Sequence, residues 1–275
     1  MFNINRDDVK WKYMLKYSQD HLVSVSPWPI SIAFSLFSLA TSLVALMHNY
    51  NYAVYFLYFS ISIVSLIFGL WIKDIIREFL FLGEHTMSSK GRFLFSFNLF
   101  VLSEIFFFGG FIFSYFYSAL VPSILLGNSW PPVGIEVLSP WSIPLLNTII
   151  LLVSGATITY SHNALLAKDR NNTLIGLFLT IALAWLFTAF QIFEYYESSF
   201  TLADSVFGAT FFSTVSLHGV HVAGGTLFLM ANYYRIWNYH FSSESHIGYE
   251  SAIIYYHFVD VVWLFVFSFF YVWAS

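Results

Sequence analysis

The 275-residue sequence contains no cysteine and very little charge. Without cysteine, the chain can form neither disulfides, thiolate metal sites nor iron–sulfur clusters. Asp, Glu, Lys and Arg together make up 9% of the residues, whereas soluble domains carry about 25%. So little charge cannot cover a surface that faces water, so we expect lipid as the surroundings. The net charge is −4 and no basic block occurs, which argues against nucleic acid as a partner.

Long apolar stretches take the place of the missing charge. Hydrophobic residues make up 58% of the sequence, and the mean hydropathy is +0.71. A transmembrane helix needs about 20 mainly apolar residues. Seven segments qualify: residues 30–47, 54–72, 93–120, 144–167, 173–193, 206–231 and 252–273. Their length and uniform apolarity favour helices over alternating barrel strands. The sequence therefore predicts an all-α integral membrane protein with seven transmembrane helices.

The positions of Lys and Arg predict the orientation of the chain. With seven spans, all eleven of these residues fall on the side of the N-terminus, and the opposite side has none. This asymmetry places the basic side in the matrix or the cytoplasm. The N-terminus is therefore expected there, and the C-terminus on the opposite side. Residues 1–26 are expected to form a retained polar extension, because their acidic residues do not fit a transit peptide.

Glu104 is the most informative polar residue within a predicted span. It follows Arg92 by about 18 Å of helix, which places it near the middle of the membrane. No basic residue occurs in its span, so desolvation should favour the neutral acid. Ionisable residues at this depth are costly and often functional. Three interpretations remain open: a group that relays or buffers protons, a sensor of a neighbouring subunit, or an acid that only hydrogen-bonds to a facing helix.

Asp260 is a second acid within a predicted span, and His257 precedes it by three residues. Residues at this spacing share a helix face, so we predict a His–Asp pair. The pair is either an architectural polar clamp or a proton-handling group.

His218 and His221 are also three residues apart and are expected to face one direction. Ligation of a metal or a haem is one interpretation. The two rings do not complete a four-ligand site, so interhelical hydrogen bonding is the favoured one.

A cluster of charged residues follows the second predicted span on the basic side. It contains Lys73, Asp74, Arg77, Glu78 and His85. Three further residues lie on the same predicted side, namely Arg235, His240 and His246. These side chains are suited to phospholipid head groups, or else they form a solvated interfacial helix with ion pairs such as Asp74 with Arg77. No nucleophile triad or phosphate-binding loop is visible, so we predict neither a catalytic residue nor a metal site.

Nine short segments resemble one known family and occur in that family's order. They are SPWP (26–29), KDIIRE (73–78), SEIFFF (103–108), WPPVG (130–134), PLLNT (144–148), EYYES (194–198), FGATFF (207–212), HGVH (218–221) and HFVDVVWLF (257–265). Through these segments the chain resembles subunit III of cytochrome c oxidase, the third core subunit of a haem–copper terminal oxidase.

The resemblance implies a particular architecture. A two-helix transmembrane hairpin is expected over residues 27–72, an inner-side linker over 73–92 and a five-helix bundle over 93–275. The hairpin and the bundle are expected to form a V with structural phospholipids in its cleft.

The resemblance also implies a non-catalytic subunit of a respiratory complex that reduces O₂ to water and pumps protons. Haem a, haem a3 and copper belong to partner subunits. Subunit I is the expected main contact, with subunit II and accessory subunits as further partners. Glu104 corresponds to the family's buried carboxyl that reacts with carbodiimides, near the proton entry of the catalytic subunit. The chain is thus expected to support proton uptake and stability of the complex.

Seven residues match the family's lipid-binding region: Trp71, Arg77, Glu78, His85, Arg235, His240 and His246. The chain departs from the family at Ile72 and Ser245, where a Trp pair and a His pair are frequent. The abundance of Phe, Tyr, Ile and Asn favours the mitochondrial inner membrane over a bacterial plasma membrane.

Two other function classes are compatible with parts of the sequence. The first is a membrane anchor that holds haem through His218 and His221. The second is a proton-coupled transporter centred on Glu104 and Asp260, for which broken helices and an inverted repeat would be typical. Neither of those features is evident in the sequence.

Overall fold

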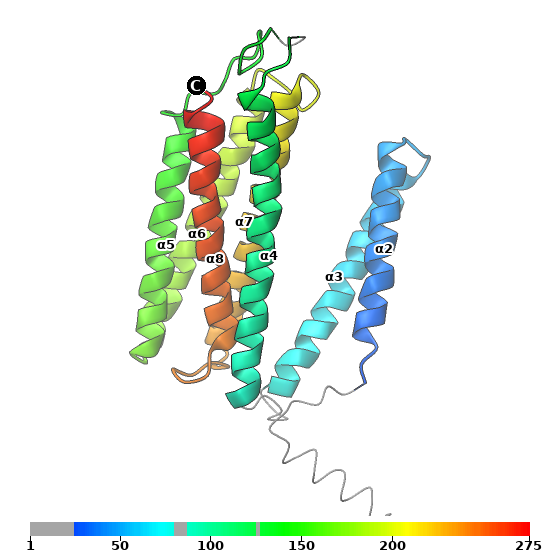
Figure 1. Cartoon of the computed structure of the whole chain (residues 1–275). Coiled ribbons are helices and arrows are strands. Elements are labelled where there is room, and N and C mark those ends of the chain that lie inside the picture. The colour runs from blue at the N-terminus through cyan, green and yellow to red at the C-terminus, as the bar shows by residue number, and fades with distance from the viewer. Residues whose placement is uncertain (1–24, 80–86, 125–126) are drawn as a thin grey trace, which may run out of the picture. The chain divides into compact units, whose positions relative to one another are not determined.

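The computed structural model describes residues 25–79, 87–124 and 127–275, and long helices dominate it (Figure 1). The helices are α2 (Trp28–Met47), α3 (Ala53–Arg77), α4 (Met87–Leu120), α5 (Ile143–Leu166), α6 (Arg170–Glu197), α7 (Val206–Trp237) and α8 (Ile247–Val266), which continues as the π-helix η3 (Phe267–Val272). Seven helices are long and apolar enough to cross a membrane, and the described residues contain no β-strand. The predicted all-α fold with seven transmembrane helices is therefore confirmed.

The helix ends extend beyond the apolar segments that the sequence marks. Helix α3 continues to Arg77, and α4 begins at Met87, so part of the predicted linker 73–92 is helical. Helix α6 begins at Arg170 because the Asp169 side chain accepts a hydrogen bond from the Asn172 amide at 3.1 Å. Polar residues can occupy the first and last turns, because backbone hydrogen bonds do not require apolar side chains.

The chain divides into two compact units, Met1–Phe93 and Leu94–Ser275. In the first unit, α2 and α3 form a hairpin whose connection contains Asn49 and Tyr52 in the left-handed backbone region. The two helices meet through small side chains: the Ser38 and Ser60 hydroxyls lie 2.9 Å apart. At the other end of the hairpin, the Trp28 indole donates to Asp74 Oδ2 at 3.0 Å.

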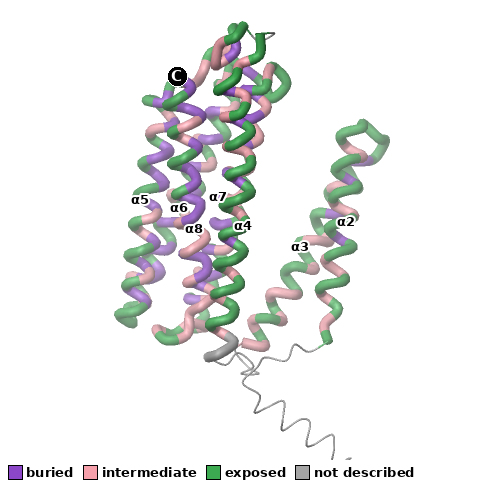
Figure 2. The backbone as a smooth tube through the Cα atoms, viewed as in Figure 1, coloured by how far each residue is buried: buried purple, intermediate pink, exposed green. Residues whose placement is uncertain are grey.

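The second unit packs α4 to α8 around an aromatic core. Trp263 is completely buried, and its ring meets that of Phe187 with 4.9 Å between centroids. Its indole donates to Thr148 Oγ1 at 2.9 Å. Tyr115 is equally buried and donates to the Phe269 carbonyl oxygen at 3.0 Å. Buried residues are concentrated in this unit (Figure 2).

Helices α5 and α6 approach each other closely at Gly176. A Cβ atom at this position would lie 2.9 Å from Ser161 Cβ and 3.1 Å from the Thr157 carbonyl oxygen. The Ser161 hydroxyl donates to the Thr173 carbonyl oxygen at 2.6 Å. Small residues allow such close approach of membrane helices.

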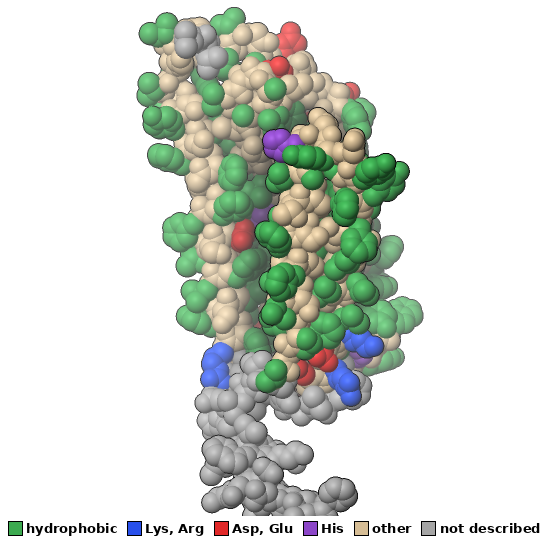
Figure 3. All heavy atoms as spheres, turned by 90° about the vertical axis from the view of Figure 1, so that its right-hand side faces the viewer, with side chains coloured by type: hydrophobic (Ala, Val, Ile, Leu, Met, Phe, Trp, Pro, Cys, Tyr) green, Lys and Arg blue, Asp and Glu red, His purple; other side chains and the backbone are tan. Residues whose placement is uncertain are grey.

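Hydrophobic side chains run along the outer surface of the helices, and the Lys and Arg side chains drawn in Figure 3 lie near helix ends.

Candidate functional site

Glu104 and His221 form a polar pair between α4 and α7 within the second unit. Glu104 Oε2 and His221 Nε2 are 2.9 Å apart. Aromatic rings enclose the imidazole: the centroid of Phe108 lies at 4.9 Å and that of Tyr255 at 6.2 Å. The side chains of the pair are mostly buried, with exposed fractions of 20% for Glu104 and 11% for His221. The structure thus gives the mid-span acid a hydrogen-bonding partner on another helix.

The hydrogen bonds of His221 restrict where its protons lie. His221 Nδ1 is 2.8 Å from the Leu217 carbonyl oxygen. A carbonyl oxygen only accepts hydrogen bonds, so Nδ1 must carry a proton. One further proton then lies between Nε2 and Glu104 Oε2. It belongs either to a neutral acid that donates to the imidazole or to an imidazolium that donates to the carboxylate. Both forms leave the pair with no net charge.

The sequence did not identify His221 as the partner of Glu104. The two residues are 117 positions apart, and local spacing carries no signal for a contact of that kind. His218 and His221 both meet α8. His218 Nε2 lies 3.2 Å from the Val259 carbonyl oxygen, and the His221 ring stacks against that of Tyr255 with 6.2 Å between centroids. His221 in addition reaches Glu104 on α4.

Both histidines thus make hydrogen bonds between helices. Both ring nitrogens of His221 are engaged in hydrogen bonds. Within the part of the chain that the structure describes, no three His, Cys, Asp or Glu side chains are grouped as metal ligands would be. The hydrogen bonds of the two rings support the interhelical role.

Asp260 and His257 lie on the face of α8 that meets α5. Asp260 Oδ2 is 3.8 Å from His257 Nδ1, and His257 Nε2 is 3.3 Å from Thr159 Oγ1 on α5. Gly155 makes room for the acid, since a Cβ there would lie 2.8 Å from Asp260 Oδ2. Asp260 Oδ1 has no hydrogen-bond partner among the described residues. The contact of 3.8 Å between Asp260 and His257 is longer than the 2.9 Å contact between Glu104 and His221. It is also more open, since the His257 side chain is 44% exposed and that of His221 only 11%.

The residues matched to lipid binding are distributed over both units. Trp71, Arg77 and Glu78 lie at the end of α3 and just beyond it in the first unit. Asp74 in the same segment accepts the hydrogen bond from Trp28. His85 lies outside the described residues, as does most of the predicted polar extension 1–26.

Arg235, His240 and His246 lie in the second unit, at the end of α7 and the start of α8. The Arg235 guanidinium is 4.1 Å from the centroid of the Phe241 ring. Burial, and then the positive charge of Arg235, lower the pKa of His240 below its usual value. His246 Nε2 lies 3.4 Å from His162 Nε2 on α5.

A cavity of about 520 Å³ lies at the same end of the second unit. Lys168 and Arg170 line it together with Ser242, Ser243 and Glu244. Arg170 Nη2 donates to the Trp237 carbonyl oxygen at 2.7 Å, which holds the guanidinium in place. Lys168 and Arg170 are not among the residues predicted to bind lipid. Their position on the predicted basic side was the available signal, but only folding brings the α5–α6 connection beside the segment between α7 and α8.

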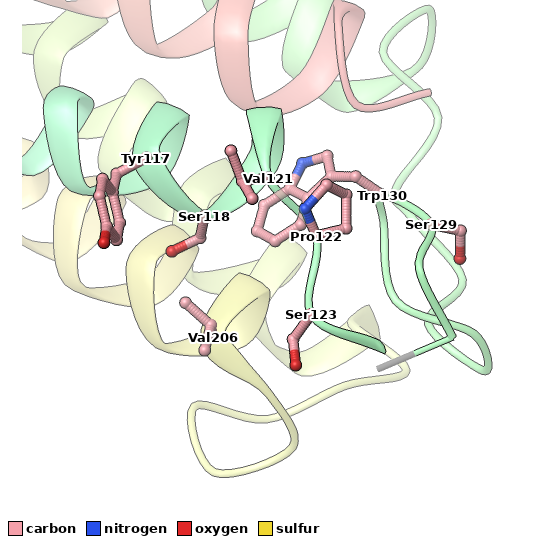
Figure 4. A pocket seen from close by; sticks show the side chains of 8 residues that line it. All are labelled: Tyr117, Ser118, Val121, Pro122, Ser123, Ser129, Trp130 and Val206. Carbon is pink, nitrogen blue, oxygen red and sulfur yellow. The ribbon is translucent and has the colours of Figure 1, made fainter. Parts of the chain in front are cut away.

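A second, smaller cavity of about 230 Å³ contains no charged side chain in its lining (Figure 4). Its lining is Tyr117, Ser118, Val121, Pro122, Ser123, Ser129, Trp130 and Val206. The Trp130 indole donates to the Tyr115 hydroxyl at 3.2 Å, so this cavity borders the aromatic core. It offers no acid–base chemistry, unlike the closely paired side chains of Glu104 and His221, which we take as the candidate site.

Known proteins are similar to this chain over nearly all of its length. The sequence profile of the family described as cytochrome c oxidase subunit III matches residues 18–275. A protein of Yarrowia lipolytica named cytochrome c oxidase subunit 3 is 47% identical over 255 residues, which cover 93% of this chain and 95% of the relative. The protein of that name from Schizophyllum commune is 48% identical over 257 residues, with coverages of 93% and 95%. That from Rhizopus stolonifer is 48% identical over 256 residues, with coverages of 93% and 90%.

Proposed function

Since this chain belongs to the cytochrome c oxidase subunit III family and is therefore a subunit of an oxidoreductase complex, we propose that it supports proton uptake and binds phospholipids. In this proposal the chain holds no redox centre of its own. Haem a, haem a3 and copper reside in partner subunits, where electrons reach O₂. The chain packs mainly on subunit I and also contacts subunit II and accessory subunits.

The Glu104–His221 hydrogen bond of 2.9 Å carries the proton part of the proposal. A proton can move along this bond without creating net charge, because the acid and the imidazole exchange it between them. Loss of the proton would leave an unpaired negative charge at membrane depth, which is costly. The pair therefore acts as a proton-holding group that releases its proton only when another arrives or when the nearby charge changes.

Hydrophobic carbodiimides test whether the acid is accessible from lipid and able to react in the assembled complex. We expect labelling of the wild-type chain and none of Glu104→Gln. Glu197→Gln is the matched control, because Glu197 is an exposed acid at the end of α6. If Glu104→Gln retains the label, the burial assignment is wrong.

Proton uptake is tested with the whole oxidase in liposomes. We expect Glu104→Gln and His221→Gln to slow proton uptake from the matrix-equivalent side and to shorten the active lifetime during turnover, since either change removes the proton-holding bond. If Glu104→Gln and His221→Gln have the same proton uptake rate and active lifetime as Glu197→Gln, the proton role is refuted. The family membership would be unaffected by that result.

The basic end of the second unit supports the lipid part of the proposal. Arg235, His240 and His246 lie in the same unit as the cavity lined by Lys168 and Arg170. Cationic and hydrogen-bonding side chains of this kind bind phosphate head groups. We expect native mass spectrometry of the complex to show fewer bound phospholipids for Arg235→Gln. An unchanged lipid count would contradict this assignment.

The mitochondrial inner membrane is the proposed location, with the N-terminus in the matrix and the C-terminus in the intermembrane space. The similar fungal proteins and the seven apolar helices support it. Cysteines introduced near each end of the chain, labelled with an impermeant thiol reagent in intact and ruptured mitoplasts, test the topology. Reaction of both ends from the same side would contradict it.

A further inference from the structure

A second buried polar site lies at the end of α6, where the proposed function assigns no role. It consists of Gln191 and Glu194 on α6 and Tyr271 on η3. Their exposed fractions are 4%, 2% and 0%. The Glu194 carboxyl lies close to the Gln191 amide and to the Tyr271 hydroxyl. The three residues therefore form one enclosed group rather than three separate buried positions.

No polar atom in this group makes a direct hydrogen bond of standard length and angle within the described residues. The polar atoms are both amide atoms of Gln191, both carboxyl oxygens of Glu194 and the Tyr271 hydroxyl. Neighbouring polar groups are satisfied: the Tyr195 hydroxyl lies 3.2 Å from Ser216 Oγ. Buried polar groups in proteins nearly always have a partner, and those without one commonly contact ordered water or an ion. Five such atoms in one enclosed place indicate a bound species.

The surroundings of the group restrict which species fits. No Lys or Arg occurs in residues 171–234 or 236–275, so no fixed cation neutralises Glu194 within these helices. Phe211 and Trp263 flank Tyr271, with ring centroids at 5.3 Å and 6.0 Å. Ca²⁺ is disfavoured, because the three side chains offer at most four oxygen ligands, whereas Ca²⁺ takes 6–8.

We propose that Gln191, Glu194 and Tyr271 form a hydration site that holds at least one buried water molecule, with Glu194 as a neutral acid. Water supplies two donors and two acceptors, so it satisfies a phenol, an amide and a carboxyl group at once. The π-helix supports the assignment, because its wider turn carries Tyr271, and π-helical turns are rare and frequently occur at functional sites.

Infrared spectroscopy of the assembled oxidase tests the neutral acid. We expect a carbonyl stretching band of a buried carboxylic acid that disappears in Glu194→Gln and persists in Glu197→Gln, the exposed acid three residues further along α6. Tyr271→Phe should shift the band to higher frequency, because the acid loses part of its hydrogen-bonded network. A band that Glu194→Gln leaves intact would overturn the protonation state.

A structure of the wild-type oxidase at a resolution that shows ordered water tests the ligand and needs no variant to fold. We expect a water molecule within hydrogen-bonding distance of all three side chains. Direct hydrogen bonds among the three side chains, with no such density, would overturn the proposal. Density that strengthens when K⁺ is replaced by Rb⁺ would also overturn it, because the species would then be a monovalent cation.

Discussion

The hairpin of the first unit and the bundle of the second are both built from apolar helices, but the two units bury very different shares of them. In the most apolar stretch of α2 and of α3, 11% of the residues are buried, compared with 17% in α4 and 39–50% in α5 to α8. In a lipid environment an exposed apolar side chain carries no hydrophobic penalty, because lipid tails are equally apolar. The larger buried share of α5 to α8 therefore reflects specific packing between helices rather than the exclusion of water.

The polar contacts follow the same division. The α2–α3 contact at membrane depth relies on small serine side chains such as Ser38 and Ser60. The bundle contains the Glu104–His221 pair, the His218 contact with α8 and the Thr157–Thr180 hydrogen bond. Ionisable groups at depth need several helices around them, and only the bundle supplies these.

The largest predicted effect comes from the core of the bundle. Trp263→Ala should lower the free energy of unfolding by about 3–5 kcal/mol, the usual range for removing a large buried aromatic side chain. Phe56→Ala in the hairpin should cost less than about 1 kcal/mol, because Phe56 is 63% exposed and lipid replaces its contacts. Unfolding of the chain in mixed micelles, followed by circular dichroism, measures both. Equal losses would remove the distinction between the two units.

Two glycines, one in each unit, test the difference in packing by the addition of a single methyl group. Gly176→Ala should destabilise the bundle by about 1–3 kcal/mol through overpacking, since its Cβ would meet Ser161. At Gly69 in α3, nothing lies within 4 Å of an added Cβ. Gly69→Ala should therefore be neutral or stabilise by up to about 1 kcal/mol, because alanine is the better helix former. A stabilising Gly176→Ala would show that α5 and α6 can separate freely.

The Glu104–His221 contact should show measurable coupling in a double-mutant cycle. With Glu104→Gln and His221→Gln, we expect a coupling free energy of about 1 kcal/mol, within the range found for hydrogen bonds between membrane helices. Glu197→Gln combined with His221→Gln is the control and should be additive, because Glu197 is exposed at the end of α6 and both ring nitrogens of His221 bond to other groups. Additivity of the first pair would mean that the hydrogen bond contributes nothing to stability.

The smallest effect is expected in the hairpin interface. Ser38→Ala removes one partner of the 2.9 Å Ser38–Ser60 contact and should cost about 0.6 kcal/mol, the average for such bonds in membranes. Ser62→Ala is the control, because the Ser62 hydroxyl donates only to the Tyr58 carbonyl oxygen of its own helix. The same unfolding assay applies, and a larger loss for Ser62→Ala would contradict the assignment of the interface.

Much of the fold could be read from local patterns, because a stretch of 20 apolar residues is visible without knowing its neighbours. The seven helices were predicted in this way, and the ends of α2 and α4 at Met47 and Leu120 agree with the apolar segments. The ends at polar residues were less accurate, as at Arg170, where a capping side chain rather than hydropathy starts the helix. The predicted V arrangement and the lipid-binding residues stay predictions.

The candidate site could be predicted only in part. Glu104 was recognisable from its depth in an uncharged span, and His257 with Asp260 from their spacing. The partner of Glu104 was not, because His221 belongs to a helix that begins about a hundred residues later in the chain. The group of Gln191, Glu194 and Tyr271 was missed for the same reason, since Tyr271 is on η3 and the other two residues are on α6.

The sequence alone determined that this chain crosses a lipid bilayer as seven helices, because apolar length and the scarcity of charge are properties of each segment by itself. It also showed that Glu104 had to be satisfied at membrane depth. Only the tertiary structure decided that His221 is the hydrogen-bond partner of Glu104, because a hydrogen bond of 2.9 Å depends on how α4 and α7 are packed and rotated. Those packing angles arise from contacts among all the helices of the bundle, which no single segment encodes.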